Sequence, residues 1–285
     1  MKAYILEAHR GVSTEYPENT LCALRAAARQ GYGMVEVDPR FTADGHCVLL
    51  HDPTLNRTAR KADGTPLAQP TPLDSLSLAQ ARELDLGVAF DPAFAGEKIP
   101  TLEEVLSFAL EARMPLKFDN VLQKYSAAQQ ETFFQAVERM GALPFVGFTA
   151  NSLEFAAHIL ARLPGAQIHY DGPASQETLR QLGALVAPEQ LTVWMRFDNA
   201  ATAWCATPPV DPASAPRRIR LAGSAYGFCA RRKSAKRPSA CTKRILSRPT
   251  ALSSRKPHVC PCRRIPLGMG VNRLWKKGKP LYSRR

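Results

Sequence analysis

The chain has 285 residues, 45% of them hydrophobic, and a formal net charge of +13. This length allows one large domain, a barrel included, with ample chain for a core. No apolar run reaches the ~18–20 residues of a transmembrane helix, and the apolar stretch at the N-terminus is too short for a secretory signal. We therefore expect a cytoplasmic protein without a transmembrane segment, whose seven cysteines need form no disulfide.

Strand-like and helix-like segments alternate through the first 210 residues. Thr101 followed by Glu104 is a capping-box signature for a helix, and Asp44-Gly45 predicts a turn. Residues 53–100 are rich in Pro, Asp and Gly and indicate an insertion. We expect strands over 3–9, 34–38, 47–51, 115–121, 145–151, 166–172 and 191–199, and helices over 18–31, 101–112, 129–140, 152–163 and 177–186.

Repeated β–α units with nearly continuous apolar strands predict an α/β fold whose parallel sheet is covered by helices. Polar residues gather at the carboxyl ends of the strands, which favours a TIM (β/α)₈ barrel with its site on that face. A doubly wound sheet is the alternative, although the first β–α turn carries no glycine-rich phosphate loop. We expect this barrel, with its insertion, to occupy residues 1–210.

The last part of the chain differs sharply in charge. Residues 211–285 hold 21 of the 38 Lys and Arg residues and a single acid, Asp211. Such a tail is typical of proteins that bind nucleic acid or acidic membranes. It has, however, no usable strand or helix period, so we expect neither a fold for it nor a nucleic-acid partner.

A shifted reading frame offers another interpretation of the tail. Back-translation of YGFCARRKSAKRPSACTKRILSRPTALSSRKP permits WLLRTPEEREAALRLYEADIVETNGALKP in a second frame, a strand–helix–strand pattern. We hypothesise a frameshift between about residues 208 and 222, which would leave the barrel incomplete by its last two β/α units. Resequencing the gene would test this hypothesis, and an intact frame would contradict it.

Acidic and basic side chains are concentrated near the predicted strand ends. Glu36 and Asp38 are two residues apart on one strand and therefore share a face. Inside a barrel this pair would be costly without a cation, and carboxylate oxygens suit Mg²⁺ or Ca²⁺. His9 and His51 end two other strands and could act as general acid and base, while Arg10 offers a planar fork for a phosphate.

Further candidates lie on later strands. Asp119 could complete a three-carboxylate metal site, and Lys117 on the same face could contact phosphate. His169 and Trp194 are candidates for the pocket wall, with core packing the alternative for the tryptophan. Together these residues indicate a metal-assisted phosphodiester site.

The motifs HRG…PENT, VEVDPRFTADGHCVLLHD, LNRT and GEKIPTLEEVL resemble, in that order, those of the glycerophosphodiester phosphodiesterase family over about residues 4–200. The resemblance implies a TIM barrel, one divalent cation, and hydrolysis of glycerophosphodiesters to glycerol 3-phosphate and an alcohol during phospholipid degradation. It implies His9 and His51 as the acid–base pair, Arg10 on phosphate, and Glu36 and Asp38 on metal. The chain departs from the family in having Val121 where most members have a lysine.

Three outcomes stay open for the function. The chain could hydrolyse glycerophosphodiesters, or it could be a related barrel phospholipase that forms a cyclic phosphate. It could also be a nonfunctional truncated product with a basic tail that binds nucleic acid.

Overall fold

The structure, a computed structural model, describes residues 5–194. The expected barrel boundary at 210, the tail and the hypothesised frameshift all lie outside these residues. The six strands of one parallel sheet are, in spatial order, β1 (Glu7–His9), β2 (Met34–Val37), β5 (Leu116–Phe118), β6 (Val146–Ala150), β7 (Gln167–Tyr170) and β8 (Leu191–Val193).

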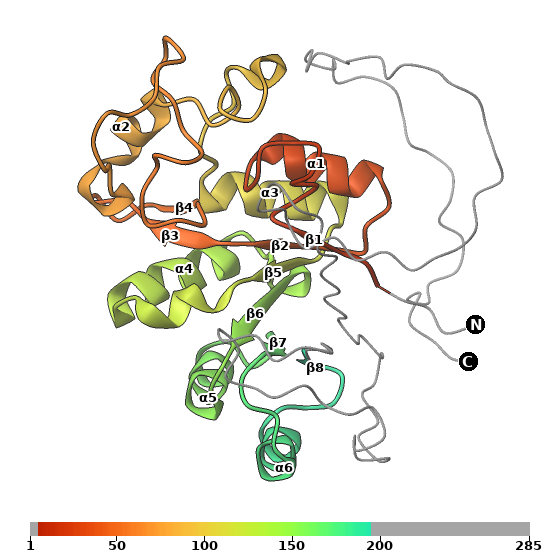
Figure 1. Cartoon of the computed structure of the whole chain (residues 1–285). Coiled ribbons are helices and arrows are strands. Elements are labelled where there is room, and N and C mark those ends of the chain that lie inside the picture. Colours follow the sequence, from red (N-terminus) through yellow and green to blue (C-terminus); the bar gives the residue numbers. More distant parts are fainter. Residues whose placement is uncertain (1–4, 195–285) are drawn as a thin grey trace, which may run out of the picture. The chain divides into compact units, whose positions relative to one another are not determined.

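Helices follow the strands and lie along the outside of this sheet (Figure 1). They are α1 (Leu21–Arg29), α3 (Leu102–Ala112), α4 (Ala127–Arg139), α5 (Leu153–Arg162) and α6 (Gln176–Leu185), with short 3₁₀ turns η3 (Asn120–Lys124) and η4 (Leu143–Phe145). The predicted α/β fold with its curled parallel sheet is thereby confirmed for the described residues. The longest of these helices has 13 residues, so no helix within 5–194 is long and apolar enough to cross a membrane.

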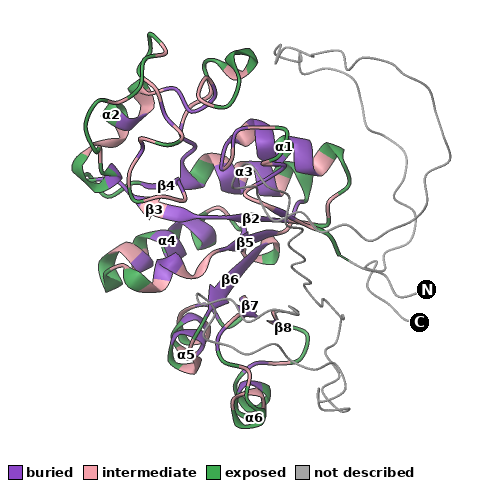
Figure 2. Cartoon of the chain, viewed as in Figure 1, coloured by how far each residue is buried: buried purple, intermediate pink, exposed green. Residues whose placement is uncertain are grey.

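The two faces of the sheet differ in chemistry because side chains alternate along each strand. The outward side chains, such as Val35, Val37 and Phe118, are fully buried, and Figure 2 shows the ribbons of β2 and β5 in the colour of buried residues. Phe133 on α4 meets Phe118 edge to face, with ring centroids 4.8 Å apart. The inward side chains are mainly polar, and Glu36 lies between Val35 and Val37 in the sequence. The helices thus cover an apolar layer, while the concave face is left for chemistry.

The segment expected as a strand over 47–51 is shorter than predicted and lies in a second sheet. β4 (Cys47–Leu49) pairs antiparallel with β3 (Pro39–Phe41). The predicted turn between them is present, and Thr42 Oγ1 donates to Asp44 at 2.6 Å. His51 therefore follows a hairpin and does not end a barrel strand. The backbone N–H of Leu50 donates to the Asp38 carbonyl at 3.0 Å, which brings His51 back beside β2.

The insertion between β4 and α3 has a small core of its own. Its elements are η1 (Leu73–Ser75), α2 (Leu78–Glu83) and η2 (Pro92–Phe94). Leu55, Leu73 and Ile99 are fully buried in that core. The Asp85 carboxylate accepts hydrogen bonds from the backbone of Gly87 and Val88 at 2.8 and 2.9 Å, and so fixes the loop that follows α2.

Candidate active site

His9 and Arg10 stand where β1 turns into the next loop. His9 Nε2 lies 3.7 Å from a Glu36 carboxylate oxygen. Burial, and then the neighbouring positive charge of Arg10, lower the pKa of His9 to about 3, so its imidazole is neutral at neutral pH. Arg10 has a left-handed backbone, with φ of 59°, and its N–H donates to Glu36 Oε2 at 3.1 Å. The turn therefore fixes both side chains against β2.

Glu36 and Asp38 are buried side by side on the inner face, as the sequence predicts. Asp38 Oδ2 accepts a hydrogen bond from Asn19 at 2.8 Å and lies 3.3 Å from Arg10 Nε. Burial raises the pKa of both carboxyls, and the charge of Asp38 raises that of Glu36 further. Two acids are thus held where their ionised forms need a nearby cation.

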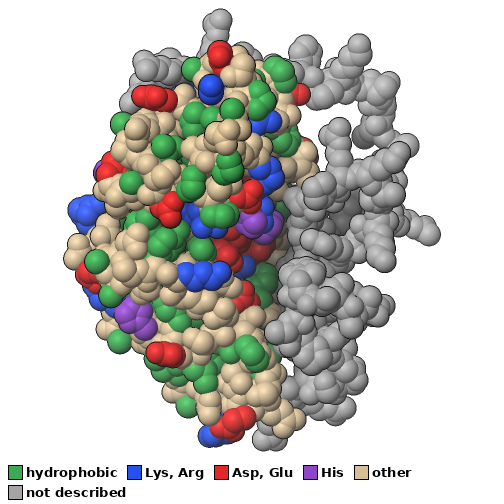
Figure 3. All heavy atoms as spheres, turned by 60° about the vertical axis from the view of Figure 1, so that its left-hand side comes forward, with side chains coloured by type: hydrophobic (Ala, Val, Ile, Leu, Met, Phe, Trp, Pro, Cys, Tyr) green, Lys and Arg blue, Asp and Glu red, His purple; other side chains and the backbone are tan. Residues whose placement is uncertain are grey.

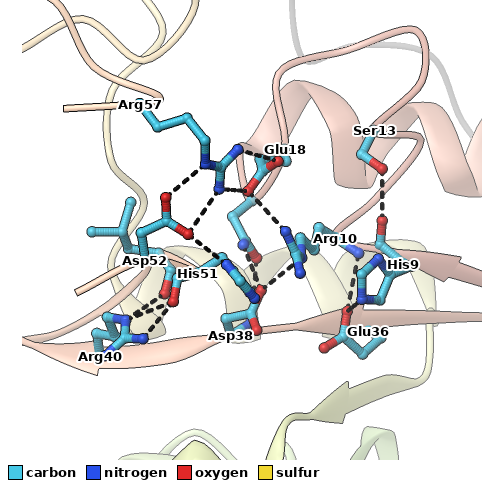
Figure 4. A network of polar contacts seen from close by, with 12 residues as sticks. His9, Arg10, Ser13, Glu18, Glu36, Asp38, Arg40, His51, Asp52 and Arg57 are labelled. Atoms are coloured by element: carbon cyan, nitrogen blue, oxygen red, sulfur yellow. Dashed lines mark hydrogen bonds and ion pairs between the residues drawn. The ribbon is translucent and has the colours of Figure 1, made fainter. Parts of the chain in front are cut away.

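His51 is oriented from two directions (Figure 4). Its Nδ1 lies 2.6 Å from Asp52 Oδ1. Its carbonyl accepts hydrogen bonds from the Arg40 guanidinium, whose Nε also donates to the Leu50 carbonyl at 3.0 Å. The contact with Asp52 leaves the other ring nitrogen, Nε2, for a substrate. Because its side chain is 42% exposed, His51 can meet a ligand from solvent.

Arg57 and Glu18 complete this cluster, and sequence reasoning missed both. Arg57 donates to both carboxylate oxygens of Asp52, at 2.6 and 3.1 Å, and to both of Glu18, at 2.9 and 2.7 Å. Glu18 also accepts from Arg10 at 3.2 Å. In the sequence Glu18 lies just before the helix α1, whose N-cap is Thr20. No local signal pairs it with an arginine 39 residues away.

Lys117 is buried on the concave face. Its Nζ is 3.5 Å from Glu7 and 4.2 Å from the centroid of the Trp194 ring. Trp194 in turn donates from Nε1 to His169 Nδ1 at 3.0 Å. The structure thus brings Lys117, His169 and Trp194 together, with His169 fully enclosed. In this position Lys117 offsets the charge of buried acids, and a contact with phosphate stays a prediction.

Asp119 lies at the carboxyl end of β5, and its N–H donates to the Val37 carbonyl at 2.9 Å. A second acid nearby, Asp171 after β7, was missed. Asp171 accepts from Asn120 at 3.4 Å, while its Oδ1 is buried and has no hydrogen-bond partner among residues 5–194. Burial raises the pKa of Asp171 to about 6. Position alone could have identified it, since it directly follows a strand.

The buried carboxylates of the site supply oxygen ligands, which a hard cation such as Mg²⁺ prefers. Within residues 5–194 no three His, Cys, Asp or Glu side chains are close enough together to hold a metal ion by themselves. Mg²⁺ commonly takes only one or two protein carboxylates and fills its octahedron with water and substrate phosphate. Such a cation would stabilise the ionised forms of Glu36 and Asp38 and so lower their raised pKa values. Basic, acidic and histidine side chains adjoin at the surface near the centre of Figure 3.

Comparison with known proteins agrees with this site. Residues 9–156, just over half of the chain, match the model of the glycerophosphoryl diester phosphodiesterase family. The match thus places this parallel α/β fold, with its buried acids and two histidines, in a family named for phosphodiester chemistry. The chain belongs to the glycerophosphoryl diester phosphodiesterase family.

Two curated relatives carry related names. The glycerophosphodiester phosphodiesterase of Caldanaerobacter subterraneus is 40% identical over 105 residues, which is 37% of this chain and 40% of the relative. Glycerophosphodiester phosphodiesterase 1 of Bos taurus is 42% identical over 122 residues, 42% of this chain and 34% of the relative. The chain therefore spans less than half the length of these relatives.

Solved structures share the fold. A Parabacteroides distasonis glycerophosphoryl diester phosphodiesterase superposes with a TM-score of 0.56 at 21% identity, covering 70% of this chain and 65% of that one. An Oleispira antarctica phosphodiesterase, solved with the product sn-glycerol-3-phosphate, gives 0.54 at 24% identity, covering 67% and 74%. At these identities the likeness concerns the fold alone.

Proposed function

We propose that this chain hydrolyses glycerophosphodiesters to glycerol 3-phosphate and an alcohol, with a divalent cation, in phospholipid degradation. The observation that carries the proposal is the position of Arg10. Its guanidinium contacts Glu18 and Asp38, and in Figure 4 it lies between His9 and His51. A phosphate bound at Arg10 would have one imidazole on each side. Family membership and the two similarly named relatives support the same activity.

The two histidines differ in a way that suits opposite roles. His9 is kept neutral by burial and by Arg10, so it can accept a proton from the attacking hydroxyl, whether from water or from the glycerol. His51 faces solvent, and its Nδ1 contacts an ionised Asp52. Asp52 would stabilise the protonated ring, which can then donate from Nε2 to the departing alkoxide.

Glu36 and Asp38 would hold the cation, and Asp119 at the carboxyl end of β5 is the proposed third carboxylate. When bound, the cation offsets negative charge that develops on the phosphate oxygens. Asn19 keeps Asp38 in place through hydrogen bonds in both directions, at 2.8 and 3.2 Å. Arg10 binds the phosphate and shares its charge.

The test is hydrolysis of glycerophosphocholine by the full chain, with release of glycerol 3-phosphate measured directly. Activity should vanish with a chelator and return with added Mg²⁺ or Ca²⁺. Phosphorus NMR of the products distinguishes linear from cyclic phosphate, and a cyclic end product would favour the phospholipase alternative. A frame-corrected chain is the matched control. Absence of hydrolysis in both chains would contradict the proposed function.

A further inference from the structure

A cavity of about 150 Å³ lies beside the proposed catalytic residues. One wall comes from the loop after β1, through Ser13, Pro17 and Glu18. The other comes from the insertion, through residues between Arg57 and Phe90. The cavity therefore lies where these two segments face one another.

The polar wall connects the cavity to the site. Arg57 and Glu18, which both line it, are joined by two hydrogen bonds. On their other sides Glu18 contacts Arg10, and Arg57 contacts Asp52, the partner of His51. A group in the cavity is thus separated by a single side chain from the proposed phosphate-binding arginine. Because Glu18 and Arg57 balance each other, this wall offers no unpaired charge.

The insertion also contributes an apolar part of the lining. It contains Leu86, Ala89 and Phe90. Phe90 is 45% exposed, so much of its surface is open to a ligand. Its ring is held edge to face by Phe94 at 5.7 Å, and Phe94 packs on Tyr16 at 5.4 Å. Phe90 is thus an exposed aromatic surface with a fixed position.

The cavity lining includes a polar atom that has no hydrogen-bond partner within the described part of the chain. Thr58 lines it, and its Oγ1 is buried with no hydrogen bond to the described residues. A buried hydroxyl without a partner is costly, and a ligand oxygen could satisfy it. Ser13 donates its hydroxyl to the His9 carbonyl at 3.0 Å, which leaves its oxygen free to accept.

We infer that this cavity receives the alcohol half of the diester and selects small, methyl-bearing alcohols of the choline type. This inference rests on the proposed function and adds a substrate class to it. A dry cavity of about 150 Å³ holds benzene, a molecule of roughly six non-hydrogen atoms. Choline is close to that size, whereas inositol is about twice as large. The face of Phe90 attracts a quaternary ammonium, and the neutral Glu18–Arg57 wall does not repel it.

The experiment compares two substrates that share glycerol phosphate and differ in the alcohol. These are glycerophosphocholine and the methyl ester of glycerol 3-phosphate, whose methyl group is too small to fill the cavity. In the full chain, Ala89→Trp should lower the ratio of their kcat/KM values at least tenfold, because the indole occupies the cavity. Ala68→Trp, at an exposed residue of the same insertion that does not line the cavity, should leave the ratio unchanged. An unchanged ratio in Ala89→Trp would overturn the inference.

Binding separates this inference from the proposed function. Calorimetric titration of glycerophosphocholine needs no turnover and should show at least tenfold weaker binding to Ala89→Trp than to Ala68→Trp. Phe90→Ala provides a second variant, and it should weaken binding of the choline ester more than that of the methyl ester. Binding without hydrolysis in the unaltered chain would contradict the proposed activity and keep the subsite. Equal binding by all variants would refute the subsite even if hydrolysis occurs.

Discussion

Asp52 accepts two hydrogen bonds from Arg57 while its Oδ1 also lies 2.6 Å from His51 Nδ1. Burial alone would raise the pKa of Asp52, but the hydrogen bonds from Arg57 and His51 outweigh it and lower this pKa to about 2. Asp52 is therefore ionised throughout the neutral range. Arg57 thus fixes the carboxylate that orients the proposed acid.

Replacing Arg57 by glutamine should lower kcat about 10- to 100-fold, the usual effect of removing a residue that orients a site ligand. Nitrogen NMR of the His51 ring gives a readout independent of turnover. We expect the Nδ1–H tautomer in the unaltered chain and a mixture of tautomers in Arg57→Gln. Arg57→Lys, which can make a single bond to Asp52, should fall between them. A pure Nδ1–H tautomer in Arg57→Gln would show that Arg57 does not position the His51 ring.

His9→Ala and His51→Ala should each abolish diester turnover and leave cation binding largely intact, because neither imidazole is a proposed ligand. Turnover is measured by release of glycerol 3-phosphate, and cation binding by calorimetric titration with Mg²⁺. His46→Ala is the control, since His46 is exposed in the β3–β4 turn. Retained turnover in His9→Ala or in His51→Ala would show that the replaced histidine is not part of the acid–base pair.

The sequence predicted local features well because their causes are local. Thr101 and Glu104 do form the capping box of α3, with bonds of 2.9 and 3.3 Å. The alternation of strands and helices likewise follows from hydrophobic period. His51 was misplaced for a different reason. Its position depends on the β3–β4 hairpin leaving the main sheet, and a short apolar run does not show which sheet it joins.

Pairings across the fold could not be predicted from one sequence. The proposed acids and histidines were identified because their spacing places them on one face or at strand ends. Lys117 was expected near phosphate, yet strand register sets it beside Glu36, where it pairs with Glu7 from a third strand. The Arg57–Glu18 bridge joins loops that only tertiary packing brings together. A single sequence contains no such information.

His169 should make the protein less stable in acid. Burial, followed by the charge of Lys117, lowers the pKa of His169 from 6.5 to about 3. Between these pH values His169 binds a proton in the unfolded chain but stays neutral in the folded chain. Stability should therefore fall as pH drops from about 6.5 to 3, by up to about 1.4 kcal/mol per pH unit for this one group.

The variant His169→Asn isolates this contribution, because its side-chain oxygen can still accept from Trp194 Nε1. Denaturant unfolding across the pH range should give a shallower acid loss in the variant than in the unaltered chain. Other groups, His9 among them, contribute equally to both proteins and cancel in the comparison. Parallel pH dependences would show that His169 titrates normally in the folded state.

Gly11 is required by the turn that presents His9 and Arg10. Its φ is +79°, and an added Cβ would lie 2.7 Å from the backbone carbon of Ala23. Gly64 has a similar φ of +82°, but no atom of the residues that the structure describes lies within 4 Å of such a Cβ. Gly64→Ala should therefore cost only the backbone strain, about 1–2 kcal/mol. Gly11→Ala should cost clearly more, since α1 must also move away from the turn.

Denaturant unfolding measures both costs, and turnover provides the functional counterpart. Gly11→Ala should reduce kcat as well as stability, because displacing the turn moves the Arg10 guanidinium away from Asp38 and Glu18. Gly64→Ala lies in the insertion, away from these residues in the sequence, and should keep its kcat. Equal losses of stability in the two variants would mean that α1 can move away from the added Cβ without a cost in free energy. The contact of Gly11 with α1 would then not be what holds the phosphate-binding arginine in place.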